Sequence, residues 1–241
     1  NGGLWRQTTD PEKEKEIVEN AMELFRESMG FKPGISRMGW NAMSNSIMNT
    51  LNSFGIKYDN TALPYYSSNG MYGGRDNIMD WKRVDDKPYH PSCSDYQCEG
   101  DMKIMEIPIS SLERKSFFFS NPRINGFTDK RSLPFIERTM SIKNRIMGSF
   151  NLSPHTNFII SPFWSNSNLR KIVDKKVLEA KNNGSSLLVG CFHPADMLDP
   201  RDGKINRVFI EKLSDILAYI RLKNTEVEII PSTLSDAMKK I

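Results

Sequence analysis

The chain has 241 residues, of which 38 % are hydrophobic and 26 % charged, so it can bury one substantial core and we expect a single domain over 1–241. Basic and acidic residues are interspersed and the net charge is only +4, which is not the footprint of a nucleic-acid binder. No apolar run approaches the ~18 residues that a membrane-spanning helix needs, and the first residues lack a signal-peptide layout, so we expect a soluble chain.

The first part of the chain alternates helix and strand signals. Asp10 and Pro11 open an apolar-periodic stretch that ends at Gly30, which predicts a capped helix. Its predicted buried stripe consists of Ile17, Val18, Ala21, Leu24, Phe25 and Met29. The next predicted elements are a strand at 35–38, a helix at 42–54 and a strand at 56–58. This β-α-β order predicts a parallel sheet.

Residues 60–101 break this rhythm, because they are rich in Asn, Ser, Gly, Pro and aromatic residues. Such a stretch is too long for an ordinary connection in a compact domain, so we expect an insertion that shapes or covers a binding site. Regular elements then resume. They are strands near 103–109 and 114–119, a helix near 133–148, a strand at 156–161, a helix at 167–182, a strand at 186–192, a helix at 204–223, a strand at 226–230 and a short helix from Ser232.

Polar or aromatic residues follow several of these strands, at the position where α/β folds build their sites. The segments are GFKPGISRMGW at 30–40, GIKYDNTALPYY at 55–66, MKIMEIPIS at 102–110 and LLVGCFHPADML at 187–198. In this order they resemble the later two-thirds of a NodB-type polysaccharide deacetylase domain, in the branch with Arg-x-Gly in place of Arg-Pro-Pro-Tyr-Gly. The resemblance implies an α/β fold, a distorted and incomplete (β/α) barrel that lacks its N-terminal strands.

The same resemblance implies an activity and a substrate. The activity is metal-dependent hydrolysis of an N- or O-acyl group, by a hydrolase acting on the carbon-nitrogen bonds of acylated sugars, with acylated polysaccharide as the partner. The alternative is a non-catalytic glycan-binding module derived from the same fold. The sequence gives no indication of the oligomeric state.

Arg37 ends the first predicted strand, and Gly39 after it lets the chain turn, so the guanidinium can lie over the mouth of the sheet. In the resembling deacetylases the matching arginine orients the catalytic aspartate, a bidentate task for which lysine is less suited. An ordinary surface arginine at a strand end is the alternative. By the same resemblance Trp40 would line the sugar site, or it packs under the helix that follows.

Asp59 and its neighbours match a segment that lies at the rim of the active site in the resembling family. Asp59 either tunes Arg37 or caps a turn. Trp81 lies in the long insertion, where the family often carries a tryptophan that packs against substrate, and the alternative is a loop aromatic that excludes solvent. An aromatic groove for a glycan would be formed by Trp40, Trp81 and Tyr65 or Tyr66.

His193 follows an apolar run at 187–192 that predicts a fully buried strand, so its imidazole would emerge at the strand end, with Pro194 fixing the exit. In the resembling deacetylases the late-strand histidine protonates the leaving amine, which suits a group that titrates near neutrality. A structural histidine is the alternative. His90 and His155 lie in loop-like sequence, and we assign neither a function.

The cofactor of the resembling family is zinc or a similar divalent metal, held by an aspartate and two histidines one helical turn apart. The sequence has no His-x-x-x-His, and its Asp-Asp pair, Asp85 and Asp86, lacks a preceding buried strand, so we interpret it as a solvated loop. The metal ligands are therefore not in this chain. Either they precede residue 1 in the parent protein, which we favour, or this protein has lost the reaction.

Three cysteines cannot form a disulfide framework. For Cys93 and Cys98 we favour free thiols in a reducing compartment, and hence a cytoplasmic location, over a local disulfide or half of a metal site. Cys191 is expected to be a small core residue. Glu106 is interpreted as a strand-end partner for a nearby cation. Signatures of dinucleotide binding, phosphate loops and serine hydrolases are absent from the sequence.

Overall fold

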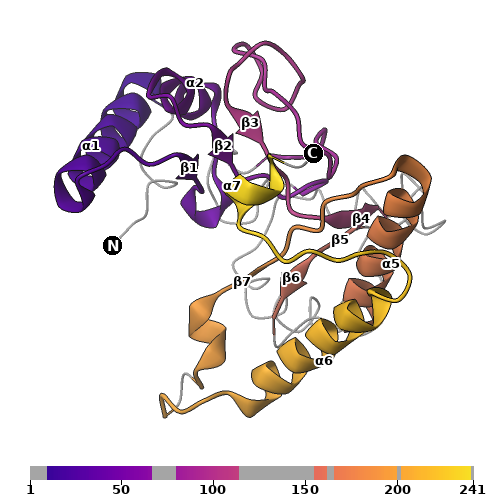
Figure 1. Ribbon diagram of the computed structural model, residues 1–241. Helices are drawn as coiled ribbons and strands as arrows, with labels where there is room; N and C mark the ends of the chain where they lie inside the picture. Colours follow the sequence, from indigo (N-terminus) through magenta and orange to yellow (C-terminus); the bar gives the residue numbers. More distant parts are fainter. Residues whose placement is uncertain (1–9, 67–79, 114–154, 162–165, 200–201, 240–241) are drawn as a thin grey trace, which may run out of the picture. The chain divides into compact units, whose positions relative to one another are not determined.

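A computed structural model of the chain describes residues 10–66, 80–113, 155–161, 166–199 and 202–239. The chain divides into two compact units, Asn1–Ile109 and Ser110–Ile241, and each is described by itself. Figure 1 draws the first unit in indigo to magenta, and the described residues of the second unit from β5 onward in orange to yellow. The expectation of one domain over 1–241 stays a prediction.

The first unit begins with α1, Pro11–Met29, whose two ends are those predicted from the sequence. The Asp10 side chain accepts a hydrogen bond from the backbone N–H of Glu12, and Gly30 closes the helix in the left-handed region at φ 75°. Both devices are local, since each satisfies backbone groups at a helix end that have no partner inside the helix.

The predicted buried stripe of α1 is largely wrong. Val18 is buried, but Leu24 and Met29 are 64 % and 55 % exposed. The helix packs on α2, Asn45–Ser53, and the contact includes a polar bond in which Ser44 Oγ donates to the buried Glu14 carboxylate at 2.5 Å. The N-terminal half of α1 is thus anchored on α2, while Leu24 and Met29 farther along remain on the surface.

Three short strands form a sheet in the order β1-β2-β3, with β1 at Ile35–Ser36, β2 at Tyr58–Asp59 and β3 at Met105–Glu106. Both pairings are parallel, as the β-α-β order predicts. The register sets Ser36 opposite Asp59 and Asp59 opposite Glu106. These three polar residues therefore form one row across the sheet, and all of them are buried.

Of the 60–101 insertion the structure describes residues 60–66 and 80–101, and the second of these parts packs against this sheet. Tyr89 and Glu106 exchange backbone hydrogen bonds of 3.0 and 2.8 Å, so the insertion pairs with β3. A 3-10 turn, η2 at Gly39–Asn41, leads from β1 toward α2. The largest fully buried side chains of the unit are Met43, Met48, Leu51, Ile56, Trp81, Ile104, Ile107 and Ile109.

The second unit contains two two-stranded sheets. The strand β4, Ser111–Glu113, pairs antiparallel with β5, His155–Asn157, and β6, Ile159–Ile160, pairs parallel with β7, Cys191–Phe192. The remaining elements are α5 at Asn166–Asn183, the 3-10 turn η3 at Pro194–Met197, α6 at Arg207–Lys223, and α7 at Leu234–Ala237 with Thr233 as its cap. The helices α5 and α6 pack on each other, as the ribbon in Figure 1 shows.

Two predicted features of this unit are wrong. The strand expected at 226–230 is irregular, because Glu226 is tied to Lys181 and Lys223 and the chain folds back so that Ile229 N–H donates to Asn224. The strand expected at 186–192 is limited to β7 and is not fully buried. Cys191 is half-buried and Phe192 is 43 % exposed, so neither is a core residue.

Two further predicted elements, the strand near 114–119 and the helix near 133–148, lie outside the described residues. The described strands form no closed barrel, which is consistent with a distorted or incomplete one. The helices in the described ranges include none with the length and apolarity that crossing a bilayer requires.

Candidate functional site

The candidate site lies at the carboxyl ends of the three parallel strands, where the row of buried polar side chains crosses the sheet. Ser36 Oγ donates to Asp59 Oδ1 at 2.5 Å, and Asp59 Oδ2 accepts from the backbone N–H of Thr61 at 3.0 Å. Glu106 Oε1 accepts from the backbone N–H of Ala62 at 2.9 Å. The two carboxyl groups thus bind consecutive backbone N–H groups, those of Thr61 and Ala62, in the turn at 60–62.

Both carboxyl groups are completely buried. Burial raises the pKa of Glu106 well above its ordinary value, and the neighbouring charge of Asp59 raises it further. Glu106 Oε2 has no hydrogen-bond partner among the described residues. No cation partner of Glu106 occurs among the described residues, where the charged group that faces it is another acid, Asp59.

Arg37 lies on the exposed side of the same turn. Its Nη1 donates to Asn60 Oδ1 at 3.3 Å, and Asn60 Nδ2 donates to the Ile107 carbonyl at 2.5 Å. No hydrogen bond or ion pair between Arg37 and Asp59 occurs in the described part of the chain. Of the two alternatives for Asp59, turn capping is the one with a contact, because the bond to Thr61 N–H spans two residues.

Trp81 packs inside the unit. It has no exposed surface, its Nε1–H donates to the Asn41 carbonyl at 2.8 Å, and its ring meets Tyr96 edge-on at 5.0 Å. Its backbone carbonyl and N–H bond to Tyr65 and Tyr66. Exclusion of solvent is therefore the role with structural support, and a contact with a sugar stays a prediction.

Tyr65 and Asn41 are non-glycine residues in the left-handed region, at φ 62° and 55°. The Trp81 side chain bonds to the Asn41 carbonyl and the Trp81 backbone carbonyl to the Tyr65 N–H, so Trp81 supports two unusual backbone conformations. Tyr65 and Tyr66 are half-buried. The side chain of Trp40, the remaining member of the predicted aromatic groove, lies outside what the structure describes.

His193 belongs to the second unit, where it follows β7 and is exposed. Its Nδ1 accepts from the backbone N–H of Ala195 at 3.2 Å, which caps the 3-10 turn η3. His193 does emerge at the end of a strand, as the sequence predicts. Its placement in one pocket with Arg37 and Asp59 stays a prediction.

The described residues do not fit the metal site of the resembling family. No group of three or more His, Cys, Asp or Glu side chains that could hold a metal ion occurs among them. His90 is engaged with the Ile104 carbonyl at 3.1 Å, and the side chain of His155 lies outside what is described. Cys93, Cys98 and Cys191 are free.

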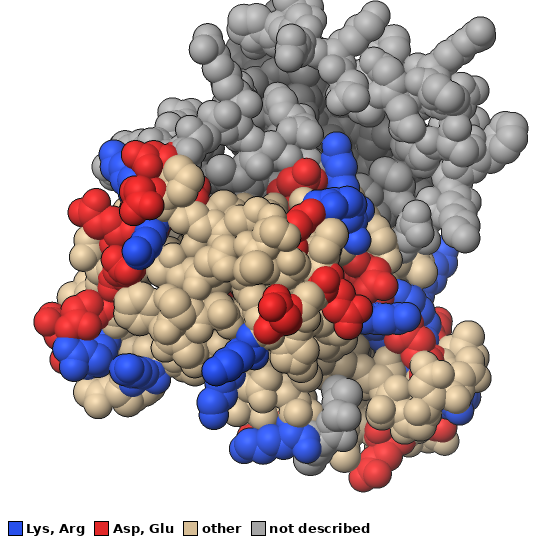
Figure 2. Space-filling view, turned by 90° about the horizontal axis from the view of Figure 1, so that it is seen from above, with Lys and Arg blue, Asp and Glu red and all other residues tan. Residues whose placement is uncertain are grey.

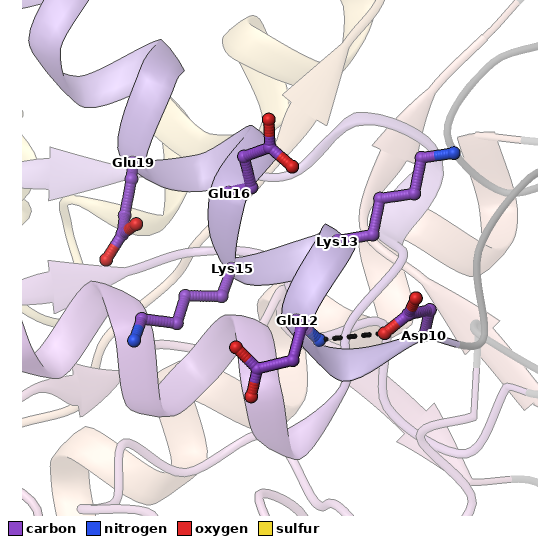
Figure 3. Close-up of a pocket in the computed structure, with 6 residues that line it drawn as sticks. All are labelled: Asp10, Glu12, Lys13, Lys15, Glu16 and Glu19. Atoms are coloured by element: carbon purple, nitrogen blue, oxygen red, sulfur yellow. Dashed lines mark hydrogen bonds between the residues drawn. The ribbon is translucent and has the colours of Figure 1, made fainter.

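A shallow hollow of about 410 Å³ lies at the start of α1 and is lined by Asp10, Glu12, Lys13, Lys15, Glu16 and Glu19. Figure 3 shows that these charged side chains fan out from one helix end, and none belongs to the predicted site. Figure 2 shows acidic and basic side chains interspersed on the face that it presents. Neither feature adds a ligand-binding group to the row at the strand ends.

Comparison with known proteins gives one distant similarity. No family model and no curated protein matches the chain. Among solved structures it is similar to one described as "Crystal structure of putative polysaccharide deacetylase from Mycobacterium smegmatis", with 15 % identity and a TM-score of 0.45, over 98 % of this chain and 59 % of that one. The chain thus spans about three fifths of that structure's length. A likeness at this level carries no conclusion about activity.

The buried acid pair is the part of the site that sequence reasoning missed. A signal was present, because Glu106 stands in MKIMEIPIS between isoleucines that occupy both alternating faces of the strand. Ile104, Ile107 and Ile109 are all fully buried, so both faces of this segment are covered. A glutamate in such a strand is itself expected to be buried, and a buried carboxyl group needs a specific partner.

Proposed function

We propose that this chain belongs to a polysaccharide-deacetylase-like enzyme that removes an N- or O-acyl group from a glycan. One observation supports the proposal most directly. Two of the four segments that carry the resemblance, Arg-x-Gly and Tyr-Asp-Asn, lie at the ends of the adjacent parallel strands β1 and β2, and they meet through the bond between Arg37 and Asn60. A chance similarity of two short segments would not require them to be neighbours at one sheet edge.

The residues of this chain would bind and orient the substrate. Arg37 is exposed and bonded on one side by Asn60, so its guanidinium is available to an anionic or carbonyl oxygen. His193 would protonate the leaving group. A doubly protonated imidazole has no acceptor, so the acid form of His193 would have to release the N–H of Ala195.

In the resembling family a divalent metal activates the attacking water, and the described residues do not fit such a site. We therefore derive no step through a metal. If the protein binds a glycan but releases no acyl group with any of the divalent metals supplied, the proposed enzyme is rejected in favour of the glycan-binding alternative.

The test is acetate release from N-acetylated and O-acetylated oligosaccharides by the full-length protein, with Zn²⁺ or another divalent ion supplied. Arg37→Ala should lower turnover by about 10²–10³-fold, the usual effect of losing one electrostatic donor, while the melting temperature stays unchanged because the side chain is exposed. Lys57→Ala, another exposed cation of the same unit, is the matched control and should retain activity. Full activity of Arg37→Ala would refute the role of this sheet edge.

A further inference from the structure

We propose that Asp59 and Glu106 share one proton at neutral pH, with Glu106 as the neutral acid, and that this pair fixes the turn at 60–62 that holds Arg37. The pair would be a positioning device, since neither carboxyl group contacts Arg37. Only the consequence for Arg37 rests on the proposed function. The shared proton itself is a property of the fold and can be tested without a substrate.

The two carboxyl groups are neighbours by the register of the sheet. Asp59 is the direct cross-strand partner of Glu106, so their side chains leave the same face on strands about 5 Å apart. Neither residue has any exposed surface. Two adjacent carboxylates in such a place cannot both ionise without a compensating cation, because burial and mutual repulsion act in the same direction.

No such cation is present among the described residues. Neither carboxyl group forms an ion pair or a hydrogen bond with Lys, Arg or His there, and Arg37 is separated from them by Asn60. Tyr89 is a titratable neighbour of both carboxyl groups, and its backbone is hydrogen-bonded to that of Glu106. Burial and these acidic neighbours raise the pKa of Tyr89, and its hydroxyl donates to the Tyr96 carbonyl, so it stays neutral.

The hydrogen bonds identify the residue that keeps the proton. Both oxygens of Asp59 are already engaged as hydrogen-bond acceptors, for Ser36 Oγ and for Thr61 N–H. Glu106 accepts a single bond, at Oε1, and its Oε2 has no hydrogen-bond partner among the described residues. A proton on Oε2 turns this isolated oxygen into a donor beside the Asp59 carboxylate, and it removes one of the two charges.

The pair acts on the turn at 60–62 through two consecutive backbone N–H groups, those of Thr61 and Ala62. The same turn is tied to the segment after β1, because Thr61 Oγ1 accepts from Met38 N–H at 2.9 Å and Asn60 accepts from Arg37. Ionisation of Glu106 would place two repelling charges under this turn. The orientation of Arg37 would then be lost at high pH.

The direct test compares the wild-type chain with Glu106→Gln, which keeps the shape, the acceptor for Ala62 and a donor toward Asp59, but has no proton to lose. The pKa of Glu106 is raised above its ordinary value of 4.5, so its contribution to stability is complete below that pH and is lost as pH rises toward the folded-state pKa. Between pH 5 and pH 8 the unfolding constant of the wild type should rise relative to the variant by up to about tenfold per pH unit.

Two further measurements make this test decisive. The infrared C=O stretch of a neutral carboxylic acid should be present at pH 7 in the wild type, absent in Glu106→Gln, and kept in the control Glu99→Gln, whose carboxylate is exposed. If Glu106→Gln fails to fold, Asp59→Asn serves instead, because removing the neighbouring charge should move the loss of the acid band to lower pH.

A wild-type protein with no acid band at pH 7, or a stability difference that does not vary with pH, overturns the shared proton. With acyl-group release as readout, the wild type should lose kcat at alkaline pH while Glu106→Gln retains it. If the infrared and unfolding measurements give the expected results but neither the wild type nor Glu106→Gln releases an acyl group, the proposed function fails and the proton assignment stands.

Discussion

Replacement of Trp81 tests whether this residue packs the first unit or binds a ligand. The ring is fully buried against Tyr96, and its N–H satisfies the Asn41 carbonyl. Truncation of a buried Trp or Phe typically costs about 3–5 kcal/mol, so Trp81→Ala should destabilise the unit by that amount. Trp81→Phe keeps most of the apolar contact but leaves a carbonyl without its donor, and should cost about 1–3 kcal/mol.

Amide hydrogen exchange measures this effect where it is expected. In Trp81→Ala, exchange in α2 should accelerate by about 10²–10³-fold or more, since each tenfold corresponds to about 1.4 kcal/mol. The helix α5 of the other compact unit serves as the internal reference. Phe31→Ala is the matched control, because that ring is 56 % exposed and meets only Phe25 edge-on among the aromatic contacts described, so it should cost at most about 1 kcal/mol.

Unchanged exchange in Trp81→Ala would refute the packing argument. If glycan binding disappeared at the same time, Trp81 would return to the predicted aromatic groove, and its burial would have to open when a ligand binds. A loss of stability with binding retained per folded molecule would assign it to the core.

Two other substitutions test local contacts. His193→Ala should lose about 0.5–2 kcal/mol of stability because the cap of η3 is missing, whereas His193→Asn keeps the cap. If His193 is a general acid, both variants should lose about 10²–10⁴-fold in turnover. Melting temperature and acetate release measured on the same samples separate the two roles, and full activity in either variant would exclude the catalytic role. Gly100→Ala would set a Cβ atom 2.5 Å from Ser92 Cα and should lower the free energy of unfolding in urea by about 1–3 kcal/mol. Gly34→Ala is the control and should be tolerated, because a Cβ atom there would have no atom within 4 Å. Equal stability of the two variants would contradict the close approach at Gly100.

The sequence by itself determined the features whose causes are local. Asp10 and Gly30 bound α1 because a cap needs only the adjacent backbone groups, and the helical periodicity of α5 and α6 is likewise contained in each segment. The alternation of strands and α2 also predicted the parallel pairing of β1 with β2, because a crossover helix favours that direction. Arg37 and Asp59 could be placed at strand ends on the same grounds.

Tertiary structure decided which of these residues are buried and what they face. Leu24 and Met29 have the spacing of a buried stripe yet lie on the surface, because burial requires an opposing element and α1 is anchored near Glu14. Glu106 was expected to meet a cation and instead faces Asp59, because register, which depends on strands far apart in the sequence, sets cross-strand partners. A side chain's charge state follows from such neighbours, and for Glu106 only the assembled sheet supplies them.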